Sequence, residues 1–240
     1  MSQVILKDFW QHAEETGHSL NARFVEIPEN LAKMTGEVQA EPVEMHSQAW
    51  KSSRITWARS THLFSPQRIQ MFNFTIYPSC SYAAPIFASD FVILGNKLRI
   101  GLVDAMPLYP NQADYQNQWL KPFAKWHQQS LRIAEVYERK LDWSFKYLSK
   151  YACLATAAPL DTLPAFLDLW QHYLDTYLAI LHNSELAGLE KQAYTKAWFA
   201  DYNRSHLAVE NKRNPLLHYF GKALGEQYNA RFLFHSEHIV

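Results

Sequence analysis

The sequence predicts an α+β fold in which an antiparallel sheet comes first along the chain and helices follow it. Two observations carry this prediction. Between about residues 52 and 105 apolar side chains recur with a period of two, as in strands, whereas beyond Pro107 they recur at helical spacing. Strands and helices that are segregated along the chain favour a sheet covered by helices over an alternating βαβ arrangement.

The composition is typical of a globular domain. The chain has 240 residues, of which 48% are hydrophobic, so it can bury a sizeable core. Gly and Pro are scattered and no linker-like tract is present, which predicts one domain over residues 1–240. Lys plus Arg and Asp plus Glu both total 23, so no net charge favours binding to nucleic acid or to an anionic membrane.

Cysteine usage and hydropathy predict a cytoplasmic protein without a membrane segment. Cys80 and Cys153 fit no metal-ligand spacing and are too few for a disulfide framework. Polar residues interrupt the first ten positions, so they lack the apolar core of a signal peptide. No run approaches the roughly 20 apolar residues that span a bilayer.

The first half of the chain predicts one helix and then strands. Residues 4–15 have helical spacing of apolar side chains, and residues 18–50 show an irregular pattern. Residues 69–77 alternate with apolar side chains on both faces, which predicts a central strand. Residues 92–98 read as two strands joined by a two-residue turn at Gly95-Asn96.

That turn predicts a register. If Leu94 pairs with Lys97, Asp90 lies opposite Gly101, where the missing side chain leaves room beside the carboxyl group. The same alternation places Asp104 on the other face, so it joins Asp90 only if a bulge or the strand end redirects it.

The second half of the chain predicts helices. Residues 113–128 form one helix that Pro122 bends or interrupts. Residues 162–182 have the strongest helical pattern, and residues 187–207 and 215–230 follow as further helices.

Asp90 is the strongest candidate for chemistry. It stands beside Phe87, Phe91 and Val92, so we expect partial burial to raise its pKa and allow it to donate a proton near neutral pH. Protonation of a bound substrate is one role for such a group. A structural alternative remains open, because an aspartate near a strand end often caps or terminates the strand.

Three blocks in order along the chain resemble the ferredoxin-dependent bilin reductases. The first runs from Asn73 to Asp90, the second is residues 102–108 with Asp104 and Pro107, and the third comprises Asn214-Pro215, residues 225–228 and residues 232–234. In this resemblance Asp90 occupies the position of the family's catalytic aspartate.

The resemblance implies a three-layer α/β/α sandwich with a central antiparallel sheet. It implies that biliverdin IXα binds between the sheet and the C-terminal helices, that electrons arrive singly from ferredoxin, and that no metal or flavin is tightly bound. Asp90 would protonate a substrate radical. The absence of a Gly-rich phosphate loop and of Cys-rich cluster ligands in the sequence agrees with this expectation.

Subtypes of the family differ at a few positions. The enzymes that make phycocyanobilin have histidine where this chain has Asn73, and glutamate on the preceding strand where the sequence places Thr56. Asn73 resembles instead the subtypes that begin at the 15,16 methine bridge and lead toward phycoerythrobilin. We therefore expect 15,16-dihydrobiliverdin as the first product, and a phycocyanobilin-type reductase is the alternative.

The C-terminal block departs from the family. Asn214 replaces an aspartate that serves A-ring protonation in several subtypes, and an amide cannot deliver a proton as a carboxylic acid does. The family usually holds the bilin propionates with Arg or Lys, and the substitutes available here are Lys150, Lys212 and Arg213. The change at Asn214 is also compatible with a carrier that binds a tetrapyrrole without reducing it.

Two further residues are candidate substrate contacts. Tyr77 lies at the end of the strand that carries Asn73. Asp104 is the acid of the second block, although it has a structural alternative as an acceptor of backbone or Arg hydrogen bonds at the sheet edge. We expect no metal site and a monomer.

Overall fold

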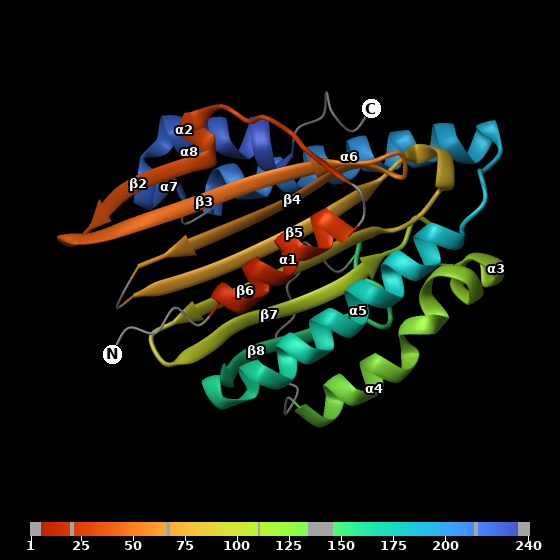
Figure 1. Ribbon diagram of the computed structural model, residues 1–240, viewed down its shortest axis with the longest axis horizontal. Coiled ribbons are helices and arrows are strands. Elements are labelled where there is room, and N and C mark those ends of the chain that lie inside the picture. Colours follow the sequence, from red (N-terminus) through yellow and green to blue (C-terminus); the bar gives the residue numbers. More distant parts are fainter. Residues whose placement is uncertain are drawn as a thin grey trace.

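The structure is a computed structural model that describes residues 6–19, 22–65, 68–109, 111–133, 146–213 and 216–234. Its centre is an antiparallel sheet of eight strands, in the order β1-β3-β4-β5-β6-β7-β8, with β2 also paired to β3 (Figure 1). The strands are β1 (Arg23–Phe24), β2 (Lys33–Val38), β3 (Glu41–Lys51), β4 (Ile55–Phe64), β5 (Ile69–Pro78), β6 (Ile86–Leu94), β7 (Lys97–Met106) and β8 (Cys153–Pro159).

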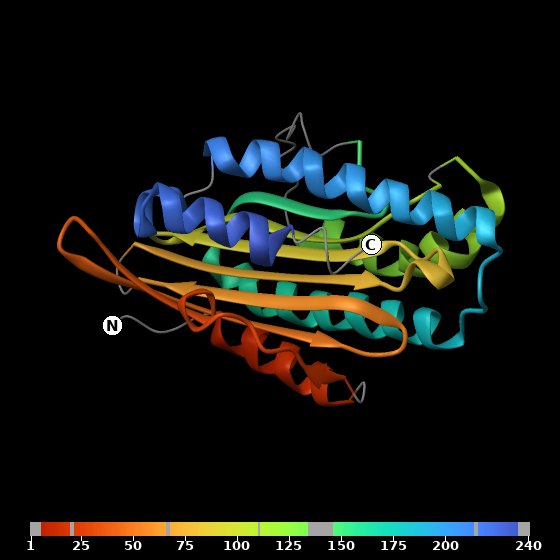
Figure 2. The ribbon, with the colours of Figure 1, turned by 90° about the horizontal axis from the view of Figure 1, so that it is seen from above.

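Helices cover both faces of this sheet (Figure 2). One face carries α1 (Lys7–Ser19) and α5 (Leu163–Asn183), with α4 (Ala124–Ile133) packed beside α5. The other face carries α6 (Leu189–Arg213), α7 (Leu216–Phe220), α8 (Lys222–Tyr228) and the π-helical turn η5 (Asn229–Leu233). The predicted α+β sandwich with three layers is therefore confirmed.

The remaining short elements connect these layers. They are α2 (Glu29–Ala32), η1 (Cys80–Tyr82), α3 (Ala113–Tyr115), η2 (Gln116–Leu120), η3 (Lys121–Phe123) and η4 (Leu160–Thr162). The helix predicted over 113–128 is interrupted at η3, which contains Pro122 near its start, as expected from a residue that lacks a backbone donor.

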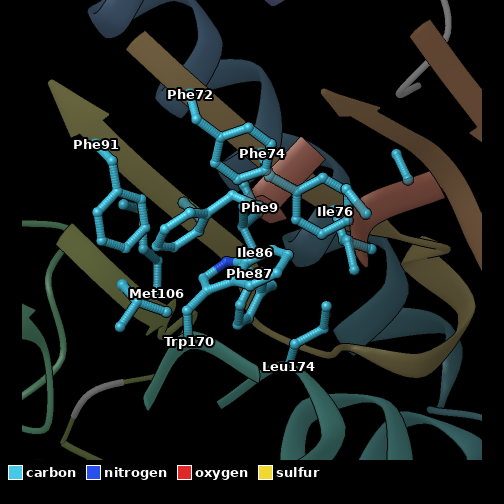
Figure 3. Packing of buried hydrophobic residues seen from close by; sticks show 14 of the residues in the cluster. Phe9, Phe72, Phe74, Ile76, Ile86, Phe87, Phe91, Met106, Trp170 and Leu174 are labelled. Carbon is cyan, nitrogen blue, oxygen red and sulfur yellow. The ribbon is translucent and has the colours of Figure 1, made fainter. Parts of the chain in front are cut away.

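The face under α1 and α5 forms an aromatic core (Figure 3). The indole of Trp170 lies 5.5 Å from the ring centre of Phe72 and donates from Nε1 to Ser89 Oγ at 3.0 Å. Ser89 Oγ in turn donates to the carbonyl oxygen of Phe74 at 3.3 Å. These contacts attach α5 to the two central strands, so the strand that carries Asp90 has a rigid support on its opposite face.

The sequence pattern over residues 18–50 is irregular, yet strands β1 and β2 and most of β3 lie there. On β3 the buried side chains alternate as in any strand covered on one face, at Val43, Met45, Ser47 and Ala49. The alternation of apolar residues is interrupted in the sequence at Ser47, because this buried residue is polar. Its hydroxyl group faces the protein interior, 2.8 Å from the Tyr228 hydroxyl group.

The predicted turn between β6 and β7 is confirmed, but the register beyond it is not. Leu94 pairs with Lys97 around Gly95, whose φ of 61° suits glycine. The ladder then shifts by one residue at Arg99, so that Asp90 lies opposite Leu102 and not opposite Gly101. A β-bulge of this kind reverses the faces of all later residues on the strand.

Candidate active site

Asn73 and Asp90 are direct neighbours on the two central strands. They lie opposite each other in the ladder between β5 and β6, on the same face as Tyr77, whose hydroxyl group bonds to Asn203 on α6. Side chains opposite each other share a face, with about 4.5–5.5 Å between Cβ atoms. Both side chains are half-buried, and Asp90 Oδ1 is buried without a hydrogen-bond partner among the described residues. A ligand with a donor group could satisfy that oxygen.

Arg59 on β4 orients the amide of Asn73. Its side chain is only 3% exposed, and Nη1 donates to Asn73 Oδ1 while Nε donates to the carbonyl oxygen of Leu233 at 3.1 Å. Because the amide oxygen of Asn73 faces the guanidinium group, its NH2 group is left to serve Asp90. Arg59 therefore links the C-terminal turn η5 to the Asn73–Asp90 pair.

The pKa of Asp90 is raised from its ordinary value of 3.8 to about 7. Burial is the largest cause, and the negative charge of Glu210 on α6 adds to it. The hydrogen bond from Asn73 and the positive charge of Arg59 act in the opposite direction. The direction expected from the apolar neighbours of Asp90 is thus confirmed, and the group carries an available proton near neutral pH.

Half-buried apolar side chains surround Asp90 on the same face of the sheet. The ladders place them on four adjacent strands, and they are Met71, Val92, Ile100, Leu102 and Leu154. Their neighbours on the opposite face, such as Phe72, Phe91 and Val103, are at most 1% exposed. The described helices thus cover this part of the sheet only in part, which leaves an apolar surface beside an acid.

Asp104 lies on the same face as Asp90, since the bulge at Arg99 redirects it. It is fully buried and accepts two hydrogen bonds from Ser149, one from the backbone N–H at 2.7 Å and one from the hydroxyl group at 2.5 Å. Burial raises its pKa to about 6, and the bonds from Ser149 oppose that rise. These contacts correspond to the structural alternative, in which Asp104 accepts hydrogen bonds at the end of β7.

Tyr77 does not reach Asp90. It is fully buried under α6, where its hydroxyl group donates to Asn203 Oδ1 at 2.8 Å and its ring packs against Phe199. Burial raises its pKa to about 12. The contacts describe a residue that joins β5 to α6, and its expected role as a substrate contact has no support in this position.

Thr56 is also distant from the pair. The β4 residue opposite Asn73 is Thr61, whose hydroxyl group lies 2.5 Å from the Tyr228 hydroxyl group. Thr56 is five positions away along β4 and lines a separate surface cavity of about 490 Å³, together with Arg23 and Lys51. Thr56 is therefore not the β4 neighbour of Asn73; that neighbour is Thr61, which likewise has no carboxyl group.

The expected ligand contacts near the C-terminus fall largely outside the described residues. Asn214 lies outside them, and of Arg213 only the backbone, at the end of α6, is described. Lys150 is described, and its ammonium group donates to Gln116 Oε1 at 2.7 Å.

Arg59 and Glu210 were not identified from the sequence. A signal for Arg59 was present, because it is a charged residue in the middle of a period-two apolar strand, where only a paired cation is tolerated. Glu210 gives no such signal, since α6 carries charged residues on several sides. Only the packing of α6 on the sheet reveals it.

The described residues contain neither a membrane-spanning helix nor a cluster of metal ligands. None of the helices in these ranges has the length and apolarity needed to cross a membrane. Within the same ranges, His, Cys, Asp and Glu side chains form no group of three that could hold a metal ion.

Comparison with known proteins shows a family to which nearly the whole sequence is similar. The sequence profile of the family described as ferredoxin-dependent bilin reductase matches residues 11–235. A 15,16-dihydrobiliverdin:ferredoxin oxidoreductase of Nostoc punctiforme is 25% identical over 210 residues, which cover 87% of this chain and 85% of the relative. A phycoerythrobilin:ferredoxin oxidoreductase of the same organism is 26% identical, covering 82% and 78%.

The fold has a counterpart among solved structures. The structure of tomato phytochromobilin synthase in complex with biliverdin superposes with a TM-score of 0.80 at 18% identity, covering 96% of this chain and 83% of the tomato chain. The family profile spans nearly the whole sequence, including both strands that carry Asn73 and Asp90. The chain belongs to the ferredoxin-dependent bilin reductases.

Proposed function

We propose that this protein reduces biliverdin IXα at the 15,16 double bond to give 15,16-dihydrobiliverdin, with phycoerythrobilin as the product of any second reduction. Ferredoxin supplies the electrons one at a time, and Asp90 supplies a proton. The protein works as a single-domain monomer without a tightly bound cofactor. The observation that carries the proposal is the Arg59–Asn73–Asp90 chain beside a half-buried apolar surface.

The chemistry of Asp90 suits a radical reduction. Each electron that reaches a bilin adds negative charge, and a neighbouring carboxylic acid can neutralise that charge by giving up its proton. A pKa of about 7 keeps a large fraction of Asp90 protonated at neutral pH. The carboxylate that remains is stabilised by the Asn73 hydrogen bond and by the charge of Arg59, so these residues lower the cost of proton release.

The regiochemistry rests on Asn73. Neither Asn73 nor the opposite residue Thr61 can titrate, so Asp90 is the acid among these three neighbours. The names of two relatives, from Nostoc punctiforme and Gloeobacter violaceus, support 15,16-dihydrobiliverdin as the first product, at 25% and 23% identity.

A carrier that binds a bilin without reducing it is the second candidate, favoured by the amide at Asn214. Anaerobic mixing with biliverdin, reduced ferredoxin and an electron source separates the two. A reductase bleaches the bound-biliverdin spectrum and forms a new product, whereas a carrier gives a stable, shifted spectrum. Chromatography then identifies the product. Formation of phycocyanobilin would contradict the prediction, made from Asn73, that reduction begins at the 15,16 double bond.

Asp90→Asn tests the proton donor. The variant keeps the shape of the side chain, so it should bind biliverdin as the wild type does, while its turnover falls by about 10²–10⁴-fold, the usual contribution of a positioned acid. Asp175→Asn, an exposed position on α5, is the matched control and should leave turnover unchanged. Normal turnover by Asp90→Asn would remove Asp90 from the mechanism.

A further inference from the structure

Helix α6 runs back along strand β5 toward the site. Just before the helix begins, Ala187 N–H donates to the Ser81 carbonyl oxygen at 2.7 Å, immediately beyond the end of β5. Near the other end of the helix, Asn211 Oδ1 accepts from Asn229 Nδ2 at 2.9 Å. Between these points Asn203 accepts the hydrogen bond from Tyr77. The helix therefore lies lengthwise on the sheet (Figure 2).

This alignment brings Glu210 to the level of Asp90. Asn73 lies four residues before Tyr77 on β5, a distance of about 13 Å at the usual strand rise. Glu210 lies seven residues beyond Asn203 on α6, a distance of about 10.5 Å at the helical rise. The distance from Tyr77 to Asn73 along β5 nearly equals the distance from Asn203 to Glu210 along α6. Glu210 therefore lies above the Asn73–Asp90 pair.

The rotation of α6 directs Glu210 toward the sheet. Phe199, Asn203 and His206 recur at helical spacing and are at most 6% exposed, so they define the face of the helix that packs inward. Glu210 continues this stripe and is half-buried. After burial, the charge of Glu210 is the largest cause of the raised pKa of Asp90. The same charge also raises the pKa of Tyr202. A nearby negative charge disfavours ionisation of Asp90.

Each two-electron reduction needs a second proton, and the amide of Asn214 cannot deliver it. We propose that Glu210 is the second acid of the site and donates one of the two protons that each bilin reduction consumes. This proposal rests on the proposed function. Two reduced ferredoxins give one electron each, Asp90 and Glu210 give one proton each, the C15=C16 π bond is lost, and C–H bonds form at both carbons. Water then reprotonates the two carboxylates.

A measurement without any bilin tests the carboxyl pair by itself. In the ligand-free protein, ¹³C NMR of the Asp90 carboxyl group gives its titration midpoint. Glu210→Gln removes the neighbouring negative charge and should lower that midpoint by about 1 pH unit. Glu210→Asp keeps the charge and should leave it nearly unchanged. Glu190→Gln, an exposed residue at the start of the same helix, is the matched control. An unchanged midpoint in Glu210→Gln would overturn the pairing.

Single-turnover reduction under anaerobic conditions tests the proton donation. Glu210→Gln should bind biliverdin as the wild type does, accept the first electron, and accumulate a radical whose decay to product is slowed by about 10²-fold or more. Glu210→Asp should recover part of the rate. Radical decay in Glu210→Gln within twofold of the wild type would overturn Glu210 as a donor.

The two tests separate this inference from the proposed function. If the wild type reduces no bilin, the proposed function fails and Glu210 donates nothing, whatever the midpoint of Asp90. If the wild type forms 15,16-dihydrobiliverdin and Glu210→Gln forms it equally fast, the function stands and only the second donor is refuted.

Discussion

Asp90→Asn also tests the raised proton affinity of the site, through the pH dependence of folding stability. In the unfolded chain Asp90 ionises near its ordinary pKa of 3.8, whereas in the folded protein it holds its proton to about pH 7. A raised folded-state pKa contributes stability that is complete below about pH 4 and is lost as the pH rises through about 7. The asparagine variant lacks this dependence because its side chain does not titrate.

The magnitude follows from the shift. A difference of about three pKa units corresponds to about 4 kcal/mol of unfolding free energy, at 1.36 kcal/mol per unit. The wild type should therefore lose about 4 kcal/mol relative to Asp90→Asn between about pH 4 and pH 8, and more than half of this between pH 5 and pH 8. Asp104 is present in both proteins, so its own titration cancels in the difference.

Urea unfolding followed by tryptophan fluorescence measures the two free energies at each pH. Asp175→Asn provides the control, because it also removes one carboxyl group but from the exposed side of α5. If the stabilities of the wild type and Asp90→Asn stay parallel from pH 5 to pH 8, Asp90 is already ionised in the folded protein. Its role as a proton donor near neutral pH would then be refuted.

Three further substitutions test the neighbours of the site. Arg59→Gln removes a positive charge that lowers the pKa of Asp90. The titration midpoint of Asp90, measured by NMR, should therefore rise from about 7 by about 1 pH unit, and a fall would contradict this effect of Arg59. Ser149→Ala leaves the buried Asp104 with one donor fewer, which should cost about 1–3 kcal/mol in urea unfolding, and an unchanged stability would contradict a structural role. Tyr77→Phe should cost about 1–2 kcal/mol but leave biliverdin affinity unchanged in an absorbance titration, whereas a large loss of affinity would restore Tyr77 as a substrate contact.

The central strands could be predicted because their signals are local. Alternation over residues 69–77 and the Gly95-Asn96 turn each depend on a few adjacent residues, and both predictions are confirmed. The pairing of Asn73 with Asp90 is different, since it depends on the connection between β5 and β6, which includes η1. No pattern of residues predicts that Asn73 pairs with Asp90. In the sequence the two residues are associated only by the resemblance to the family.

The bulge on β7 could not be predicted for a related reason. Leu98, Ile100 and Leu102 alternate without interruption in the sequence, so a regular strand puts them on one face. In the structure Leu98 faces the aromatic core and is fully buried, while Ile100 and Leu102 face the other side and are half-buried. Arg99 is the extra residue, and an inserted residue becomes visible only when its partner strand is known.

The proton affinity of the site depends on four elements together. Burial on β6 and the charge of Glu210 on α6 raise the pKa of Asp90, while Asn73 on β5 and Arg59 on β4 lower it. Burial and Glu210 alone would raise the pKa of Asp90 further above neutrality and make it too weak an acid to donate. Asn73 and Arg59 alone would lower the pKa and leave a carboxylate without a proton. Arg59 also bonds to Leu233 in η5, so the C-terminal layer takes part in this balance. A displacement of that layer would therefore change the acidity of Asp90 even if β5 and β6 stayed in place.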